Sequence, residues 1–251
     1  ATATPFHGDG VIAPNYGRPY ASQIKTESER LRIGLLFEND RVEIHNDCVE
    51  AVQKTAIHLS DLGHEIVQSH PKALGEISDN EDLNRAFSVN WSVGAMLSLD
   101  YFGKILGREL TDSDVELGTW VMAEFGRNLS ASDYAQSQSV MADWRRSLAS
   151  WWADGYDILL TPTTSLPPPL IGELTPTNDD PLRGSKRSMP YATFTSPFNT
   201  TGQPAISLPL GTSNNLPIGV QLVAAYGRED LLISLASQLE ESAGWLTHTP
   251  S

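Results

Sequence analysis

Two groups of residues in this chain have types and spacings that catalysis or metal binding could use. Ser22 and Lys25 have the Ser-x-x-Lys spacing, in which a lysine amine one helical turn away can act as base for a serine nucleophile. The surrounding stretch is rich in Pro, Gly and polar residues without a helical period, so we interpret the match as chance. His58, His64 and His70 are too far apart for one helical turn and no cysteine pair accompanies them, so no metal site is expected.

Other familiar catalytic and cofactor patterns are missing from the sequence. It contains no Gly-x-Ser-x-Gly elbow, no Walker loop and no Gly-x-Gly-x-x-Gly fingerprint, so no cofactor is predicted. Residues 111–116 (TDSDVE) gather carboxylates at the start of an expected helix, where the positive helix end stabilises them. We interpret that acidic cluster as capping rather than catalysis.

The stretch at 194–209 (FTSPFNTTGQPAISLP) poses a sharper question. It places polar residues, including Asn199 and Gln203, directly before an apolar run that reads as a buried strand. Such a loop is either an ordinary connection or the rim of a site. In open α/β sheets, ligands bind beside loops at the ends of the strands.

The elements that would position such a loop begin after residue 30. A strand at 32–37 precedes a helix capped by Asn46 or Asp47 and ended by Gly63, and a second strand follows at 64–68. This β-α-β pattern implies parallel strands in a covered sheet.

The rest of the chain alternates between helix and strand. A helical segment covers about 79–154, a strand lies at 156–160 and a proline-rich loop follows it. AISLPL and IGVQLVA suggest a hairpin across GTSNNLP, and a helix closes the chain. One stripe is predicted to be core: Tyr134, Gln138, Met141, Trp144, Leu148 and Trp151.

The predicted fold class is therefore α/β, with a mixed, partly parallel sheet covered by helices. Residues 1–30 read as an extended lead-in, and 31–251 as one domain part carrying a mainly helical insertion at about 79–154.

Charge and composition exclude several kinds of partner. The net charge is −14, which repels phosphate backbones and anionic membranes, so no nucleic acid or membrane partner is expected. No apolar run approaches the ~20 residues that span a bilayer. Cys48 is the single cysteine and the N-terminus lacks the pattern of a secretory signal, so the expected location is cytoplasmic.

PFNTTGQPAISLPLG followed by LPIGVQLVAAYGREDLLISLASQLE resembles the C-terminal end of the amidase signature family. LRIGLL (31–36), VELGTWVMAEFGRNLSASDY (115–134) and DILLTPT (157–163) are similar to further family landmarks, so the resemblance extends from about residue 20 onward. It is closer to the broad acyl amidases than to the amidotransferase subunit that works on aminoacyl-tRNA. The expected fold is thus the C-terminal half of the amidase signature fold.

The resemblance implies hydrolysis of a carboxamide through an acyl-enzyme, with a nucleophilic Ser, a bridging Ser and a Lys base. In the family these three residues lie in the N-terminal half, the two serines within a Gly/Ser-rich signature. This sequence has neither a Gly-Gly nor a Ser-Ser dipeptide, so no catalytic residue is assigned to this chain. We expect a C-terminal fragment, inactive alone, whose partner is an N-terminal catalytic half or a separate chain.

The resemblance also implies that C-terminal loops form one wall of the substrate pocket. Phe194 is the expected apolar wall, Thr195 or Asn199 a hydrogen-bonding group, and Trp91 a second wall, all toward a small-molecule amide. The alternatives are that Asn199 satisfies its own turn and that Gln203 braces the missing half.

A second function class stays open, namely a non-catalytic binding or regulatory module with a half-amidase fold. Half of a continuous sheet would present an unpaired edge, which favours a partner chain or a homo-oligomer.

Overall fold

The computed structural model describes residues 14, 19–24, 29–76, 80–177 and 179–244. Most of the predicted lead-in, including Lys25, lies outside the described residues; within it, Tyr20–Gln23 forms a short 3₁₀ helix, η1. The strands are β1 (Arg32–Leu35), β2 (Glu65–Val67), β3 (Ile158–Pro162), β4 (Ala205–Ser213) and β5 (Leu216–Ala224). The helices are α1 (Asn46–Asp61), α2 (Ala73–Glu76), α3 (Glu81–Leu106), α4 (Leu117–Arg127), α5 (Ala131–Ala153), α6 (Arg183–Ala192), α7 (Ser196–Thr201) and α8 (Glu229–Ala243).

The five strands form one mixed sheet in the order β2-β1-β3-β5-β4. β1 pairs in parallel with both β2 and β3, while β5 pairs antiparallel with both β3 and β4. This arrangement confirms the predicted α/β class with a partly parallel sheet. Among the described residues no helix is long and apolar enough to cross a membrane.

The β4–β5 hairpin turns more tightly than the sequence suggested. Its strands run to Ser213 and from Leu216, so only Asn214 and Asn215 remain in the turn. Both have positive φ, 48° and 65°, a conformation that asparagine tolerates better than most residues. The predicted seven-residue connection is therefore mostly strand.

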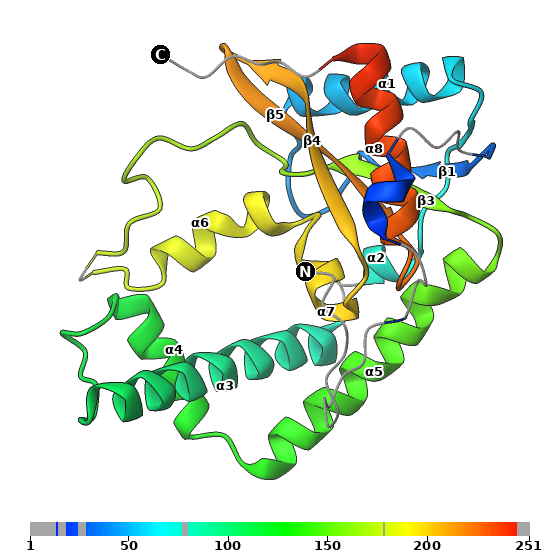
Figure 1. Cartoon of the computed structure of the whole chain (residues 1–251). Coiled ribbons are helices and arrows are strands. Elements are labelled where there is room, and N and C mark those ends of the chain that lie inside the picture. The colour runs from blue at the N-terminus through cyan, green and yellow to red at the C-terminus, as the bar shows by residue number, and fades with distance from the viewer. Residues whose placement is uncertain (1–13, 15–18, 25–28, 77–79, 178, 245–251) are drawn as a thin grey trace.

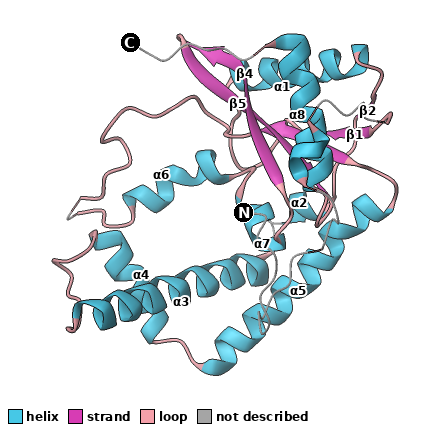
Figure 2. Cartoon of the chain, viewed as in Figure 1, coloured by secondary structure: helices cyan, strands magenta, loops and turns pink. Residues whose placement is uncertain are grey.

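Helices cover both faces of the sheet (Figures 1 and 2). On one face, α1 and α8 pack their apolar stripes against Ile33, Leu160 and Leu222. On the other face, α5 and α7 pack against Leu159 and Val223. Every residue of β3 is buried, as expected for a central strand between two layers.

The helices α3 and α4 extend away from the sheet together with the first turns of α5, and we call this part the helical arm (Figure 1). At the outer end of α3, Tyr101, Phe102 and Ile105 are more than half exposed. The N-terminal part of α5 belongs to the arm, whereas its C-terminal part lies on the sheet.

The position of the arm corrects the predicted core stripe of α5. Met141, Trp144, Leu148 and Trp151 are buried, but Tyr134 is 42% exposed because the first turns of α5 run beside α3 rather than over the sheet. At the buried end, the ring nitrogens of two tryptophans have hydrogen-bond partners. Trp144 Nε1 donates to the Ala73 carbonyl at 2.9 Å and Trp151 Nε1 to Ser69 Oγ at 3.0 Å.

Two local predictions were wrong. The N-cap of α1 is His45, whose Nδ1 accepts from the Asp47 backbone N–H at 3.2 Å, rather than Asn46 or Asp47. The stretch expected as a loop around 194–204 contains α7. Pro197 lies in the first turn of that helix, where its missing N–H costs no hydrogen bond, and Gly202 ends it with φ of 71°.

Because α3 packs closely on α4, glycine-to-alanine substitutions in these two helices are expected to change stability in opposite directions. A Cβ added at Gly126 would lie 2.4 Å from the Ser92 carbonyl oxygen, whereas one at Gly94 meets nothing within 4 Å. We expect Gly126→Ala to lower the free energy of unfolding by about 1–3 kcal/mol, because the added methyl group overpacks the contact. We expect Gly94→Ala to raise it by about 0.5–1 kcal/mol, because alanine has the higher helix propensity. Urea unfolding of both variants measures this, and equal effects would contradict the close contact.

Candidate functional site

A cavity of about 850 Å³ opens between the helical arm, α6 and the sheet, at the carboxyl ends of β1 and β3. Its size lies within the range of small-molecule sites, and its place is where open α/β sheets bind ligands. The lining residues are Leu36, Glu38, Asn39, Asp40, Arg41, His70, Leu74, Gly75, Asn84, Phe87, Ser88, Trp91, Ser92, Val121, Met122, Phe125, Thr161, Leu182, Ser185, Ser188, Met189, Ala192, Thr193, Phe194, Ser196, Pro197 and Phe198.

The inner wall of the cavity is apolar and firmly held. Phe194 and Phe198 are each only 4% exposed and belong to the core on that face of the sheet. Phe87, from α3, packs edge-on against Trp144 with ring centroids 5.6 Å apart. Because these rings are fixed by the core behind them, the cavity has a preformed apolar shape.

Gln221 fixes the position of this wall relative to the sheet. Its buried Nε2 donates to the Phe194 carbonyl at 2.7 Å and to Thr161 Oγ1 at 3.1 Å. A buried amide with both bonds made is costly to displace. One side chain of β5 therefore links the end of β3 to the segment that carries Phe194.

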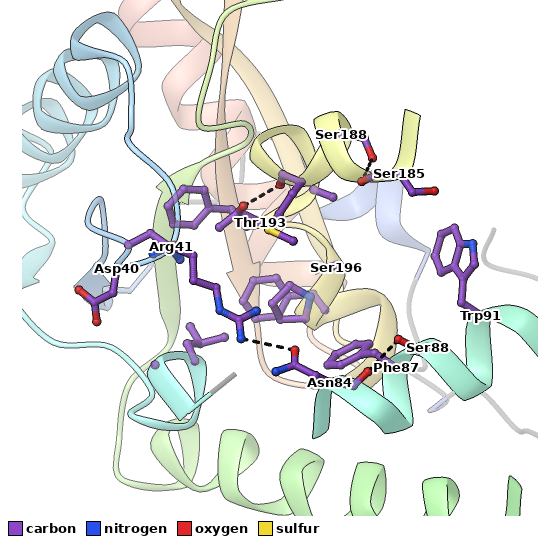
Figure 3. Close-up of a pocket in the computed structure, with 18 of the residues that line it drawn as sticks. Asp40, Arg41, Asn84, Phe87, Ser88, Trp91, Ser185, Ser188, Thr193 and Ser196 are labelled. Atoms are coloured by element: carbon purple, nitrogen blue, oxygen red, sulfur yellow. Dashed lines mark hydrogen bonds between the residues drawn. The ribbon is translucent and has the colours of Figure 1, made fainter. Parts of the chain in front are cut away.

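Three hydroxyl groups around the cavity already donate to backbone carbonyls of their own helices. Ser88 Oγ donates to the Asn84 carbonyl at 3.0 Å, Thr193 Oγ1 to the Met189 carbonyl at 2.7 Å, and Ser188 Oγ to the Ser185 carbonyl at 3.1 Å (Figure 3). Their remaining lone pairs can accept a hydrogen bond. At these positions the lining can therefore accept from an amide N–H.

Charged residues lie on one rim, in the segments that follow β1 and β2. Glu38, Asp40 and Arg41 come directly after β1, and Arg41 Nη2 donates to Asn84 Oδ1 at 3.4 Å (Figure 3). Asn39 Oδ1 accepts from the Arg41 backbone N–H at 2.9 Å and holds this turn. The ionic groups are thus confined to one side of the cavity, and the other lining side chains are uncharged.

Two of the four residues that the sequence suggested for substrate contact line the cavity. Phe194 belongs to the inner wall and Trp91, 69% exposed, stands on α3 (Figure 3). Thr195 is half-buried and its Oγ1 donates to the Ala192 carbonyl at 3.3 Å, while Asn199 is exposed. Among the described residues that border the cavity, neither Thr195 nor Asn199 appears.

Several lining residues were missed by sequence reasoning. Phe87, Met122 and Phe125 come from α3 and α4, where helical spacing alone reads as ordinary packing.

Gln203 donates from Nε2 to the Ala224 carbonyl at 3.0 Å, so that amide group braces this chain's own hairpin. Within the described part of the chain, no cluster of three His, Cys, Asp or Glu side chains could hold a metal ion.

Comparison with known proteins gives a consistent set of matches. The family model described as Amidase matches residues 6–233. The 6-aminohexanoate-cyclic-dimer hydrolases of Paenarthrobacter ureafaciens and Pseudomonas sp. (strain NK87) are 37% and 36% identical, each covering 97% of this chain and 50% of the relative. The chain therefore spans about half the length of these curated relatives.

Solved structures agree with the sequence comparison. The structure of 6-aminohexanoate cyclic dimer hydrolase superposes with a TM-score of 0.90 at 35% identity, covering 98% of this chain and 52% of that chain. A bacterial aryl acylamidase of the amidase signature family superposes with a TM-score of 0.69 at 18% identity, covering 90% of this chain and 46% of that chain. The second match shows the shared fold.

His70 on the charged rim predicts a loss of stability in acid. Burial lowers its pKa below the ordinary value of 6.5, and the Glu38 carboxylate opposes this only in part. The unfolded chain therefore binds the proton more readily than the folded chain does. The stability that neutral His70 contributes is present above about pH 6.5 and is lost as the pH falls below that value. Urea midpoints at about pH 7.5 and 5.5 should differ more for the natural chain than for His70→Gln; an equal difference would contradict the assignment.

Proposed function

The chain belongs to the amidase family, and on that premise we propose that it is the C-terminal, substrate-binding part of an amidase that hydrolyses a carboxamide C–N bond. The supporting observation is a preformed apolar cavity at the end of the sheet, in a chain spanning about half the length of its hydrolase relatives.

Catalytic residues of the Ser-Ser-Lys type would come from a segment outside these 251 residues. Among the residues that the structure describes, no lysine borders the cavity, so a proton-accepting amine is not supplied there. In the proposed reaction a serine oxygen attacks the amide carbonyl carbon, the C–N bond breaks and the amine leaves with a proton relayed by lysine. Water then hydrolyses the acyl ester and regenerates the serine.

The cavity favours an uncharged, largely aliphatic acyl group. Its inner wall is built from Phe87, Phe194 and Phe198, and ionic groups are confined to the rim. Burying an unpaired charge against such a wall would be unfavourable. Two relatives are named for a cyclic dimer of 6-aminohexanoate, and we propose a substrate of that uncharged amide class for this protein.

The test is an amidase assay on the complete polypeptide that the gene encodes, together with its intact mass. We expect a polypeptide longer than this chain that hydrolyses acyl amides and short cyclic or linear amide oligomers. A gene product without amide hydrolysis after removal of contaminating amidases would instead favour a non-catalytic binding module.

Trp91 provides a prediction for substrate binding in that assay. It is 69% exposed, so Trp91→Ala should leave the fold intact while removing part of the cavity wall. We expect kcat/KM for bulky amides to fall about tenfold, equivalent to ~1.4 kcal/mol of lost transition-state binding.

Phe102→Ala is the matched control, because Phe102 is 52% exposed on the same helix and does not border the cavity. Equal losses in the two variants would contradict a role for Trp91 in the site.

A further inference from the structure

The cavity has two apolar walls that differ in how they are held. The inner wall carries Phe194 and Phe198, which are each 4% exposed because the core packs behind them. The second apolar wall lies farther from the sheet, where α3 and α4 lie opposite α6, and we call it the outer wall (Figure 1). It is formed by Trp91, Val121, Met122, Phe125, Leu182 and Met189.

Large side chains of the outer wall are open to solvent. Trp91 is 69% exposed, and Phe125 and Met189 are each 49% exposed. Single exposed apolar side chains are common on protein surfaces, but these gather in one concave site. Apolar atoms of a ligand would remove this surface from water, which is favourable.

The outer wall is also uncharged. Among the described residues that line the cavity, the acidic and basic ones are Glu38, Asp40 and Arg41, all on the rim that follows β1. An ionic group placed against the outer wall would lose water without gaining a partner of opposite charge. A hydrocarbon segment therefore fits this wall better than an ionic group does.

The outer wall has a methionine from each of its two sides. Met122 lies on α4 and Met189 on α6, and Ser185 Oγ of α6 lies 4.0 Å from Met122 Sδ. Methionine is unbranched and flexible, so it adapts to ligands of different shape. α6 has no buried residue, so no core fixes its side of the wall. The outer wall can thus accommodate a flexible chain.

The helix α3 connects the two walls. Phe87 packs against Trp144 at the inner wall, and Trp91 follows one helical turn later, about 6 Å along the helix axis. Figure 3 shows Phe87 and Trp91 in succession on α3, with Ser185 of α6 across from Trp91. A substrate chain that starts at the inner wall therefore reaches the outer wall only if it is long enough.

We propose that the outer wall is a second hydrocarbon subsite, with Met122 and Met189 as specificity-determining residues, which selects amides whose aliphatic chain covers both walls. This inference rests on the proposed function, because it names which amides of that class the site selects. Short acyl amides cover the inner wall alone and gain nothing from the outer one.

A homologous series of linear amides from acetamide to octanamide tests the inference in the complete polypeptide. Each methylene that the cavity buries should raise kcat/KM about threefold to fourfold. We expect this rise to continue up to octanamide, because the outer wall takes the part of the chain that extends beyond the inner wall. A value of kcat/KM that stays flat from butanamide to octanamide would overturn the inference.

The two methionines can be tested through a ratio of substrates. We expect Met122→Ala and Met189→Ala each to lower the ratio of kcat/KM for octanamide to that for butanamide at least about threefold, because each removes apolar contact with the end of the chain. A disturbed fold would lower kcat/KM for both substrates and leave their ratio in place.

Ile105→Ala is the matched control for that ratio. Ile105 is 61% exposed on α3 and does not border the cavity, so its loss should leave the ratio unchanged. Methionine variants with the same ratio as Ile105→Ala would contradict the assignment.

Met189→Lys provides a test in which specificity is gained. Because Met189 is 49% exposed, a lysine stem can lie along the wall with its ammonium in water. We expect kcat/KM for octanedioic acid monoamide, relative to octanamide, to rise at least about fivefold over the natural chain, because the ammonium attracts the carboxylate at the chain end. An unchanged ratio would show that the chain end does not reach α6.

The outcomes separate the inference from the proposed function. A complete polypeptide that hydrolyses none of these amides would overturn the proposed function and the inference with it. Hydrolysis at rates independent of chain length would overturn the inference alone, and this is the result expected if a further segment of the polypeptide covers the outer wall.

Discussion

Complete burial of β3 is the constraint on which the other layers depend. Its five residues lie between β1 and β5 and none reaches solvent, so apolar cover is needed on both faces. α1 and α8 supply it on one side, and α5 with α7 on the other. Beyond Thr161 that second cover ends. The cavity lies where it ends.

The tryptophans of α5 explain how one helix serves both the sheet and the arm. Trp151 stacks on Tyr156 with ring centroids 4.1 Å apart and fills the space above Gly34, where a Cβ would lie 2.3 Å from its ring. Trp144 instead contacts Phe87 of α3. The same helix therefore anchors the arm to the sheet and holds one wall of the cavity in place.

Much of the architecture follows from sequence patterns, because apolar runs such as those containing Ile33, Leu159 and Leu222 have few alternatives to a buried strand. The helix α6 was not predicted, since its sequence is short and mostly polar and contains Pro190. The sequence predicts Thr195 at the site because its polar stretch indicates a loop. The helix α7 instead sets its direction. The sequence does not predict that Phe87 and Met122 line the cavity, because this depends on how the arm lies relative to α6.

The long excursion of the arm also has consequences for folding kinetics. β1 ends at Leu35 and β3 begins at Ile158, so their parallel pairing must close a loop containing the whole arm. The β4–β5 hairpin closes across only Asn214 and Asn215. Strand pairs that are close in sequence form faster than distant ones, so we expect the β4–β5 hairpin to form before β5 pairs with β3. In this chain, the helices that shape the cavity are the same ones that delay completion of the sheet beneath it.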